Sequence, residues 1–541
     1  MLGRRNRQRS LFDSQVLVHR VPEDSFYGRM GAVSDVLFCD DDLAEMYCAD
    51  NGRPGLPPSL MSGVTILQFH DDVSDREAVN RTLYDLRWKV ALDLPLDFEG
   101  FDDSSLSVFR KRMVEHGQER YAFDRFIQVG RAAGFIPDKV TLLTDTTSTK
   151  GAGAVQDTYT LLRKGTRKLL RALGYHLPGK RRGLSKQVKA LVSTYVDQGR
   201  KADIDWSDAQ QRKAQLQTLV QDVEAALDLA TEQMDNEEVR AIGWLLTKIL
   251  GDDLEEDDGG EVQIAKGTAA DRVISITDPA MRHGRKSASQ RFDGFKVSVS
   301  TEESSELIMD VGDLAANDRD GTELMPTIER VEQHAEVMVE QVIADGAYNS
   351  GDNLAACADH PGHAIDLLGP FHRPPDPEVD KSAFQLDLDA QVAMCPEGHT
   401  VEGKPVRDNK KRPVLRFTFP RAVCEACPRF ERCVRSKRHG RTVTTHAHEV
   451  LLRQARARQQ TAASKARYRL RSAVERKIGE LVRHGIRNTR YLGARKRQLQ
   501  RLWTGAAVNM KRLFALAEAQ HADLRAAFIG LGPPAVQMVD A

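Results

Sequence analysis

The chain has 541 residues, which at about 100–200 residues per domain allows roughly two to four domains with sizeable hydrophobic cores. Lys and Arg together number 78, as do Asp and Glu, so the formal net charge is zero and the total charge indicates no polyanionic partner. No run of about 18 apolar residues occurs, which argues against a membrane span. No apolar segment follows the basic N-terminus, which argues against a secretory signal.

The first quarter of the chain is predicted to be helical after an Arg-rich lead, in which Arg4–Arg9 could form a disordered arm. Apolar residues recur at helical spacing in Leu60–Phe69 and in Asp75–Val90. Asp102–Ser105 is typical of the N-terminal cap of a further helix, which carries Phe109 and a short basic run.

The segment Lys139–Asp145 is predicted to be a buried strand that ends in a carboxylate. Residues 155–250 have the pattern of long, charged amphipathic helices, with Trp244–Leu246 as an apolar core patch. The acidic, Gly-containing run 251–261 is predicted to be an exposed linker.

Further strands are predicted downstream, and Leu324–Gln333 is predicted to be a helix. The predicted strands are Gly294–Ser300, Leu307–Gly312, Val337–Ala344 and His363–Leu368. Without the block 155–250, the order is strand, strand, strand, helix, strand, helix, strand and a terminal helix. This is the order of an RNase H-like core, so we predict an α/β fold with a mixed sheet, interrupted by a large helical insertion and a second, Cys-rich insert.

Four of the seven cysteines lie in a Pro- and Arg-rich stretch. They are Cys395, Cys424, Cys427 and Cys433. Such thiolates can hold a structural Zn²⁺, with His399 as an alternative ligand, and a small insert with few apolar residues could use the metal to fold. The other reading is ordinary reduced thiols of a cytoplasmic protein. Cys39, Cys48 and Cys357 have no neighbouring partner and are predicted to be buried small hydrophobes.

Positive charge is concentrated near the C-terminus. Between Leu451 and Ala515 there are 18 Lys and Arg, against the two acids Glu475 and Glu480. A chain polarised in this way can offer a basic surface to nucleic acid. Shorter basic clusters lie at Arg282–Lys286 with Arg291, and at Arg407–Arg416, Arg429–Arg441 and Arg487–Arg501.

Three carboxylates stand out among the predicted elements. Asp145 and Asp345 each end an apolar strand, and Glu475 lies on a helix that is almost free of acids. Each alone is most often a turn or surface residue, but their conjunction suits phosphodiester chemistry. Carboxylates that meet at one edge of a sheet can hold two Mg²⁺ or Mn²⁺ ions about 3.5–4 Å apart, which activate a water and stabilise the leaving oxygen.

The helix with Glu475 carries a second pattern. Tyr468, Arg471 and Glu475, at i, i+3 and i+7, are expected on one face of a continuous helix. Arg471 could then orient the carboxylate or bind a phosphate.

These residues resemble the DDE transposases of bacterial insertion sequences, in the branch with the signature Tyr-x2-Arg-x3-Glu-x6-Lys. Tyr468, Arg471 and Glu475 match its first three positions, whereas the Lys position is Val482, with Arg483 one step away. The context Asp-Gly-Ala-Tyr at residues 345–348 is similar to that of the family's second aspartate, and Asp145 to the first. The resemblance covers roughly residues 31–515.

The resemblance implies a transposase that cuts DNA at the ends of an insertion sequence and joins the freed 3′-hydroxyl to target DNA. Asp145, Asp345 and Glu475 would ligate two Mg²⁺ ions, supported by Tyr468, Arg471 and Arg483. The partners would be terminal inverted repeats and target DNA, with a homodimer synapsing two ends in the bacterial nucleoid. DNA contacts are predicted at Arg110, Arg112, Arg285, Lys286, Lys296, Arg487 and Arg490.

The predicted division of the chain follows from these features. It comprises a basic lead segment (1–30), an N-terminal helical DNA-binding domain (31–135), the first core strand (136–154), the helical insertion and acidic linker (155–261), the catalytic core (262–371), the Cys- and Arg-rich insert (372–450), the C-terminal core helices (451–519) and a tail (520–541).

Other functions remain open at the level of sequence. An RNase H-like nuclease would only hydrolyse DNA, and a strand-transfer assay separates it from a transposase. A non-catalytic, zinc-stapled DNA-binding protein would not bring the three carboxylates together. A relic transposase would bind ends without cutting them, and Val482 at the Lys position is the feature that suggests it.

Overall fold

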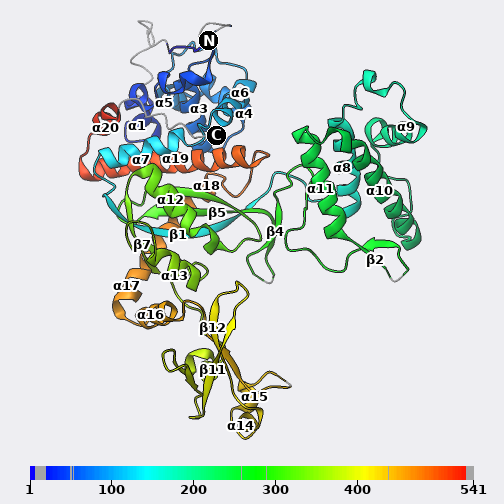
Figure 1. The fold of residues 1–541 in the computed structure, drawn as a ribbon. Helices are drawn as coiled ribbons and strands as arrows, with labels where there is room; N and C mark the ends of the chain where they lie inside the picture. The colour runs from blue at the N-terminus through cyan, green and yellow to red at the C-terminus, as the bar shows by residue number, and fades with distance from the viewer. Residues whose placement is uncertain are drawn as a thin grey trace.

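The computed structural model describes residues 1–5, 20–48, 52, 54–257, 259–287, 289–436 and 438–531. Figure 1 shows a mixed α/β body from which a helical unit and a β-rich insert project. The mixed α/β class is as predicted. Most of the predicted N-terminal arm lies outside the described residues. In the part of the chain that is described, no helix is long and apolar enough to cross a membrane.

A six-stranded mixed sheet forms the centre of the body. Its strands are β1 (Lys139–Lys150), β4 (Arg282–Arg285), β5 (Arg291–Glu302), β6 (Ile308–Ala315), β7 (Met338–Ile343) and β8 (Asp366–Leu368). The order is β4-β5-β1-β7-β8, with β6 also paired to β5. β5 runs antiparallel to β1 and β6 antiparallel to β5, whereas β7 is parallel to β1 and β8 parallel to β7.

Neighbouring parallel strands must be joined by crossover connections, and two helices lie in the connections that lead to β7 and β8. Helix α12 (Leu324–Ala335) leads from β6 into β7, and α13 (Gly351–Ala358) connects β7 to β8. Strand β5 is nearly fully buried, with Val297 and Val299 in the core. Its sequence alternates these apolar residues with polar ones, but Ser298 and Ser300 on the second face are buried as well, so the strand is covered on both sides.

The N-terminal helices and the C-terminal helix α19 (Ala494–Gln520) cover one face of the sheet. The N-terminal helices are α1 (Phe26–Ala32), α2 (Ser34–Leu37), α3 (Pro58–Asp71), α4 (Asp75–Tyr84), α5 (Leu86–Ala91), α6 (Ser104–Glu115) and α7 (Tyr121–Ala132). One hydrophobic cluster runs through all these parts, from Met30 to Phe528. The predicted division at residue 135 therefore separates no independent core.

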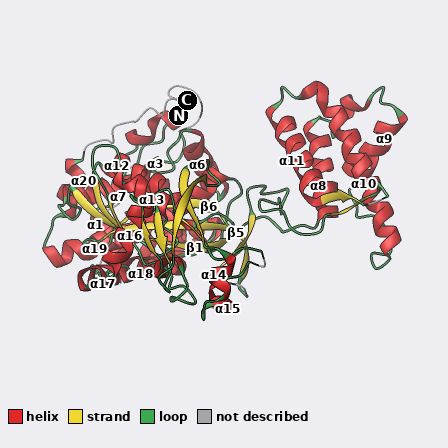
Figure 2. Ribbon diagram, turned by 60° about the horizontal axis from the view of Figure 1, so that its bottom comes forward, coloured by secondary structure: helices red, strands yellow, loops and turns green. Residues whose placement is uncertain are grey.

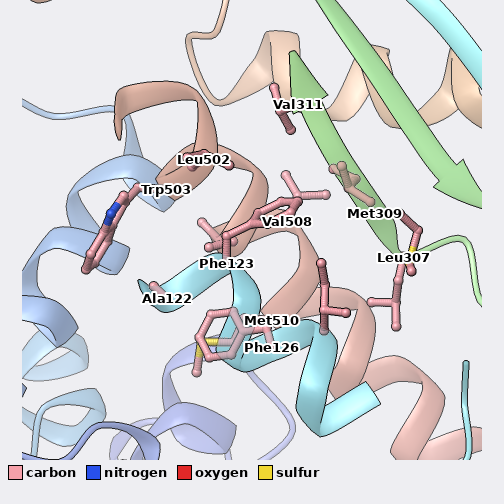
Figure 3. Close-up of a cluster of buried hydrophobic side chains, with 14 of the residues drawn as sticks. Ala122, Phe123, Phe126, Leu307, Met309, Val311, Leu502, Trp503, Val508 and Met510 are labelled. Carbon is pink, nitrogen blue, oxygen red and sulfur yellow. The ribbon is translucent and has the colours of Figure 1, made fainter. Parts of the chain in front are cut away.

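Figure 3 shows where these parts meet: the side chains of Phe123 and Phe126 of α7 lie among those of α19, with Met309 and Val311 of β6 nearby. Gly505 of α19 permits the close approach, because a Cβ there would lie 2.9 Å from the Phe123 ring. The described part of the predicted tail, residues 520–531, also packs on this core. It contains α20 (Leu524–Gly530), whose Phe528 is buried.

The helical insertion stands apart from the sheet in both ribbon views (Figures 1 and 2). It contains α8 (Thr158–Ala172), α9 (Lys186–Val192), α10 (Ala209–Ala230) and α11 (Glu237–Asp253), packed around a hydrophobic cluster of their own.

Two predictions for this insertion were wrong. The expected linker is the end of α11 followed by a hairpin of β2 (Leu254–Glu256) and β3 (Val262–Ile264), because apolar Leu254 and Ile264 pair across it. Trp244 is 66% exposed, since helical spacing turns it away from the buried pair Leu245 and Leu246.

The second insert is a five-stranded antiparallel sheet with two short helices. Its elements are β9 (Gln385–Asp387), β10 (Val392–Met394), β11 (Thr400–Arg407), β12 (Pro413–Thr418), α14 (Arg421–Glu425), α15 (Phe430–Cys433) and β13 (Thr442–Thr444). The chain then returns to the body through α16 (Glu449–Gln459), α17 (Ala462–Arg469) and α18 (Ser472–Arg483).

We predict that Phe123→Ala weakens the N-terminal helices and the sheet together. The change should lower the opening free energy of amides in both α3 and β6 by about 3–5 kcal/mol, the usual cost of truncating a buried Phe. Native-state hydrogen exchange measures this. Tyr84→Ala, at a position 79% exposed, is the control and should change it by less than about 0.5 kcal/mol. Loss of protection in α3 alone would show that the two parts have separate cores.

Candidate active site and cysteine cluster

Asp145 and Asp345 are brought together by the pairing of two parallel strands. The last paired positions of β1 and β7 are Leu143 and Ile343, and each Asp lies two residues beyond its strand's paired position. Asp145 was predicted to end its strand, which is wrong: β1 continues to Lys150 because its second half pairs with β5. Asp145 thus lies in mid-strand, beside the point where β7 ends.

Glu475 reaches the same edge from the C-terminal helices. Arg471 donates to Asp145 Oδ2 at 2.8 Å and to Glu475 Oε1 at 2.7 Å, so one guanidinium joins both carboxylates. The Arg471 side chain is mostly buried, whereas Glu475, in the first turn of α18, is 56% exposed.

The predicted continuous helix through Tyr468, Arg471 and Glu475 is not observed. Helix α17 ends at Arg469, and α18 begins at Ser472 with Arg471 as its N-terminal cap residue. The junction is held by tighter bonds, in which the Arg471 N–H donates to the Tyr468 carbonyl, three residues back. Arg471 nevertheless lies over the Tyr468 ring, with its guanidinium carbon 6.0 Å from the centroid.

The charges of the three acids all act on the groups around Arg471 and Tyr468. Burial raises the pKa of Asp145 above its ordinary value, and the charge of Asp345 adds to this effect, while Arg471 opposes it. Burial also raises the pKa of Tyr468, and the negative charges of Asp345, Asp145 and Glu475 act in the same direction. Two carboxylates that destabilise each other's charge in a partly buried site favour a bound cation.

The donor set suits a hard divalent ion, because it consists of carboxylate oxygens from three separate elements. The three acids do not close into one tight group, however. Among the described residues, only Glu332, His360 and His363 form a group of three or more potential ligands whose donor atoms lie within 4.8 Å of one another. Between Asp145 and Glu475 lies the Arg471 guanidinium, which occupies the position of a shared counter-charge.

A further acid near the site is not apparent from the sequence pattern. Asp320, in a short turn before α12, accepts from the Thr146 hydroxyl at 2.7 Å and from Lys296 Nζ at 2.7 Å. It begins a 3₁₀ helix of four residues, Asp320–Glu323, which is too short to show a periodicity, so no spacing rule selects it. Through its bond to the Thr146 hydroxyl, Asp320 fixes the residue that follows Asp145.

The residues around the missing signature Lys differ in exposure. Val482 is half-buried and packs against the main core, whereas Arg483 ends α18 and is exposed.

Several predicted DNA contacts are engaged within the protein. Arg110 is buried and ion-paired with Asp75, so it is not available to DNA, and that prediction was wrong. Lys296 is bound to Asp320, and Arg490 pairs with Asp72. Arg112 is half-buried, and its guanidinium carbon lies 4.7 Å from the centroid of an aromatic ring, that of Tyr47. The exposed members of the predicted set are Arg285, Lys286 and Arg487.

The four late cysteines surround one small cavity of about 30 Å³, which His399 also lines. Cys395 begins a tight turn after β10, and the backbone N–H groups of Arg429 and Arg441 lie 3.4 Å from Cys427 Sγ and 3.5 Å from Cys424 Sγ, respectively. Such N–H donors stabilise thiolates. Burial raises the pKa of the Cys433 thiol, and charge on Cys424, Cys427 or Cys395 would raise it further.

The other cysteines differ from one another. Cys357 is buried as predicted, but Cys39 and Cys48 are exposed, so the prediction that they are buried small hydrophobes was wrong. Neither position falls on a periodic apolar face, because Cys39 precedes and Cys48 follows the short 3₁₀ helix Asp41–Met46.

Comparison with known families agrees with this organisation. A model described as a transposase DDE domain matches residues 394–514, from β10 through most of α19. A second, described as a transposase domain, matches residues 15–112, which include most of the N-terminal helices. No curated protein and no solved structure matches the chain. The first match contains Tyr468, Arg471 and Glu475. Together the two matches support a DDE transposase of insertion-sequence type.

Proposed function

We propose that this transposase cleaves DNA at the ends of its element and transfers the freed 3′ ends into target DNA, using Asp145, Asp345 and Glu475 as its three carboxylates. The observation that carries the proposal is the parallel register of β1 and β7, which sets Asp145 and Asp345 two residues beyond a shared paired position. Glu475, joined to Asp145 through Arg471, supplies the third acid from the C-terminal helices.

The fold proposed for the core is RNase H-like, as a transposase DDE domain implies. The strand order supports it: antiparallel β5, which also pairs with β4 and β6, lies on one side of central β1, and the two parallel strands β7 and β8 lie on the other. In this arrangement the helical insertion follows the first core strand, and the Cys-rich insert follows the last.

DDE transposases generally act with divalent metal ions, and the three carboxylates would hold two ions here, Mg²⁺ or Mn²⁺ by their preference for oxygen. When bound, the ions activate the attacking oxygen and stabilise the leaving one. Attack of water at phosphorus breaks the bond to the 3′ oxygen and leaves a 3′-hydroxyl. That hydroxyl then attacks a target phosphodiester and releases a target 3′-hydroxyl, so no covalent protein–DNA bond is needed. Arg471 holds the Asp145 and Glu475 carboxylates in place.

The proposed partners are the terminal inverted repeats and the target DNA. The exposed cations Arg285, Lys286 and Arg487 can contact phosphates without reading sequence. Two element ends must be held together for transfer, so we propose a homodimer in the synaptic complex. A nuclease that only hydrolyses is the competing function, and production of joined element–target strands in a strand-transfer assay distinguishes the two.

We predict that Asp145→Asn and Asp345→Asn each abolish cleavage and leave binding to element ends intact or stronger. Each change removes a metal ligand and also a negative charge that repels phosphate. Cleavage and gel-shift assays on one preparation measure both properties. Asp138→Asn, at an exposed acid at the start of β1, is the matched control and should cleave normally. Full cleavage by either site variant in Mg²⁺ would contradict the assignment.

The Asp145→Asn variant should also be more stable than the wild type in metal-free buffer at neutral pH. A raised pKa means that the folded protein holds the Asp145 proton more tightly than the unfolded chain does. Ionisation at pH 7 therefore costs folding free energy, and a neutral amide avoids that cost. Thermal unfolding measures the difference, and a lower midpoint for the variant would show that the Arg471 ion pair outweighs the burial of charge.

We predict that Arg471→Lys is much more damaging than Arg483→Lys. Arg471 bonds two carboxylates at once, which the single ammonium of Lys cannot reproduce, so cleavage at saturating DNA should fall about 10–100-fold. Arg483 is exposed at the end of α18, and Lys there should be nearly silent, while Arg483→Ala should weaken binding in a salt-dependent way. A larger defect in Arg483→Lys would make Arg483 the counterpart of the family's Lys.

We further propose that Cys395, Cys424, Cys427 and Cys433 bind a structural Zn²⁺. The shared cavity and the N–H groups beside two sulfurs support it. When both are purified without chelator, the Cys424→Ser variant should contain about one zinc per chain less than the wild type. Adding a chelator to the wild type should increase hydrogen exchange in residues 390–440 before the rest of the chain. Cys39→Ser, at an exposed site, is the control and should keep its zinc. Equal zinc in wild type and Cys424→Ser would favour plain thiols.

A further inference from the structure

A second cluster of potential metal ligands lies away from both the three carboxylates and the cysteines. It consists of Glu332 near the end of α12 and of His360 and His363 in the turn between α13 and β8. One donor atom from each residue lies within 4.8 Å of the others. All three side chains are at least three-quarters buried, and His360 is only 7% exposed.

The distances within the cluster suit ligands that share an ion. His360 Nε2 lies 3.4 Å from Glu332 Oε2, and His363 Nε2 lies 3.3 Å from Glu332 Oε1. Charge-assisted hydrogen bonds between such groups are shorter, at about 2.7–2.9 Å. Ligands at roughly 2.0–2.2 Å from a tetrahedral Zn²⁺ are separated from each other by roughly 3.3–3.6 Å. Each of the two spacings, measured to a different Glu332 oxygen, is of this size.

Local sequence explains why the two imidazoles converge. The segment His360-Pro361-Gly362-His363 turns sharply, and Gly362 has a φ of +90°, which favours glycine. The turn brings the two rings to a centroid distance of 4.9 Å, at 69° to each other. The pattern His-x2-His thus provides two ligands from one turn, and α12 provides the third.

Hydrogen bonding alone does not account for the cluster. His360 Nδ1 is buried and has no hydrogen-bond partner among the described residues. His363 Nε2 also lies 2.9 Å from the Val339 carbonyl oxygen, and the Val339 N–H donates to Glu332 Oε1 at 3.0 Å. The Val339 N–H thereby orients the Glu332 carboxylate, in the way that outer partners commonly orient metal-binding side chains. The Val339 carbonyl contacts the same His363 nitrogen that faces Glu332, so a bound ion would replace that contact.

We propose that Glu332, His360 and His363 bind one divalent transition-metal ion, of which Zn²⁺ is the probe of choice, with the fourth position open to water. Two imidazoles and one carboxylate are a donor set that suits such ions. The ion joins the end of α12, the start of β7 and the turn before β8. Val339 precedes Asp345 by six residues, or roughly 20 Å of extended chain, so the role is to fix β7 rather than to take part in the chemistry.

This proposal does not depend on the proposed function, and zinc counting tests it in the full-length protein. After dialysis against Zn²⁺ and removal of loose metal, His360→Ala and Glu332→Gln should each contain about one zinc per chain less than the wild type. Cys424→Ser should lose its zinc independently, and adding His360→Ala to it should remove a further equivalent. Equal zinc in the wild type and in His360→Ala overturns the proposal, whatever the cysteines bind.

The chain offers a matched control. His446 and His448 also face one carboxylate, with their Nε2 atoms 3.9 and 3.7 Å from Asp352 Oδ1, but Arg412 and Lys410 already neutralise that acid. His446→Ala should therefore leave the zinc content unchanged.

A second measurement covers the case in which His360→Ala fails to fold. X-ray absorption at the zinc edge of the wild type should show nitrogen or oxygen neighbours at one site, beside any sulfur neighbours from the cysteines. In the Cys424→Ser variant loaded with Co²⁺, the remaining ion should give visible bands without thiolate charge transfer. A zinc spectrum with sulfur neighbours only, or no bound Co²⁺ in that variant, overturns the proposal.

Discussion

The parallel pairing of β1 with β7 is the constraint on which the candidate site depends. Because the two strands run in the same direction, Asp145 and Asp345, each two residues beyond the pair Leu143 and Ile343, lie side by side. A shift of one residue would turn Asp145 to the opposite face of the sheet. The buried core between α7, β6 and α19 resists such a shift, because it fixes the sheet against helices from both ends of the chain.

Charge that is polarised along the sequence is largely compensated in the fold. Arg497 and Arg501 of α19 both pair with Asp313 of β6, and Arg467 pairs with Glu303. Burial lowers the pKa of Arg501 to about 10, although Asp313 opposes the shift. The concentration of cations in residues 451–515 therefore reflects, in part, the acids on the strands that these helices cover. It is a weaker indicator of a DNA-binding surface than the sequence alone suggests.

The sequence predicts the order of the core elements well, because each has a clear period or a run of apolar residues. The mixed α/β class and the similarity to transposases, which two family models support, followed from it. What it could not predict depends on contacts between distant residues. Asp145 lies in mid-strand because β5 extends the pairing, and Arg110 is buried because Asp75 neutralises it. The break before Arg471 lies within a stretch whose composition is helical throughout, so only tertiary contacts select the position.

Arg471 bridges Asp145 and Glu475, and a divalent ion would compete with its guanidinium for Asp145. Asp145 is more than half buried and its neighbour Asp345 is also an acid, so an unpaired Asp145 charge would be costly. Arg471 supplies a positive charge at that point and keeps Glu475 near it at the same time. A divalent ion that binds Asp145 offers the same carboxylate a stronger partner, so ion and guanidinium compete for it. The released guanidinium would then lie beside the ion and free to meet a phosphate, which bidentate Arg geometry suits. A Lys at this position would neutralise one carboxylate but could not hold both, and the exposed Glu475 would be left to solvent.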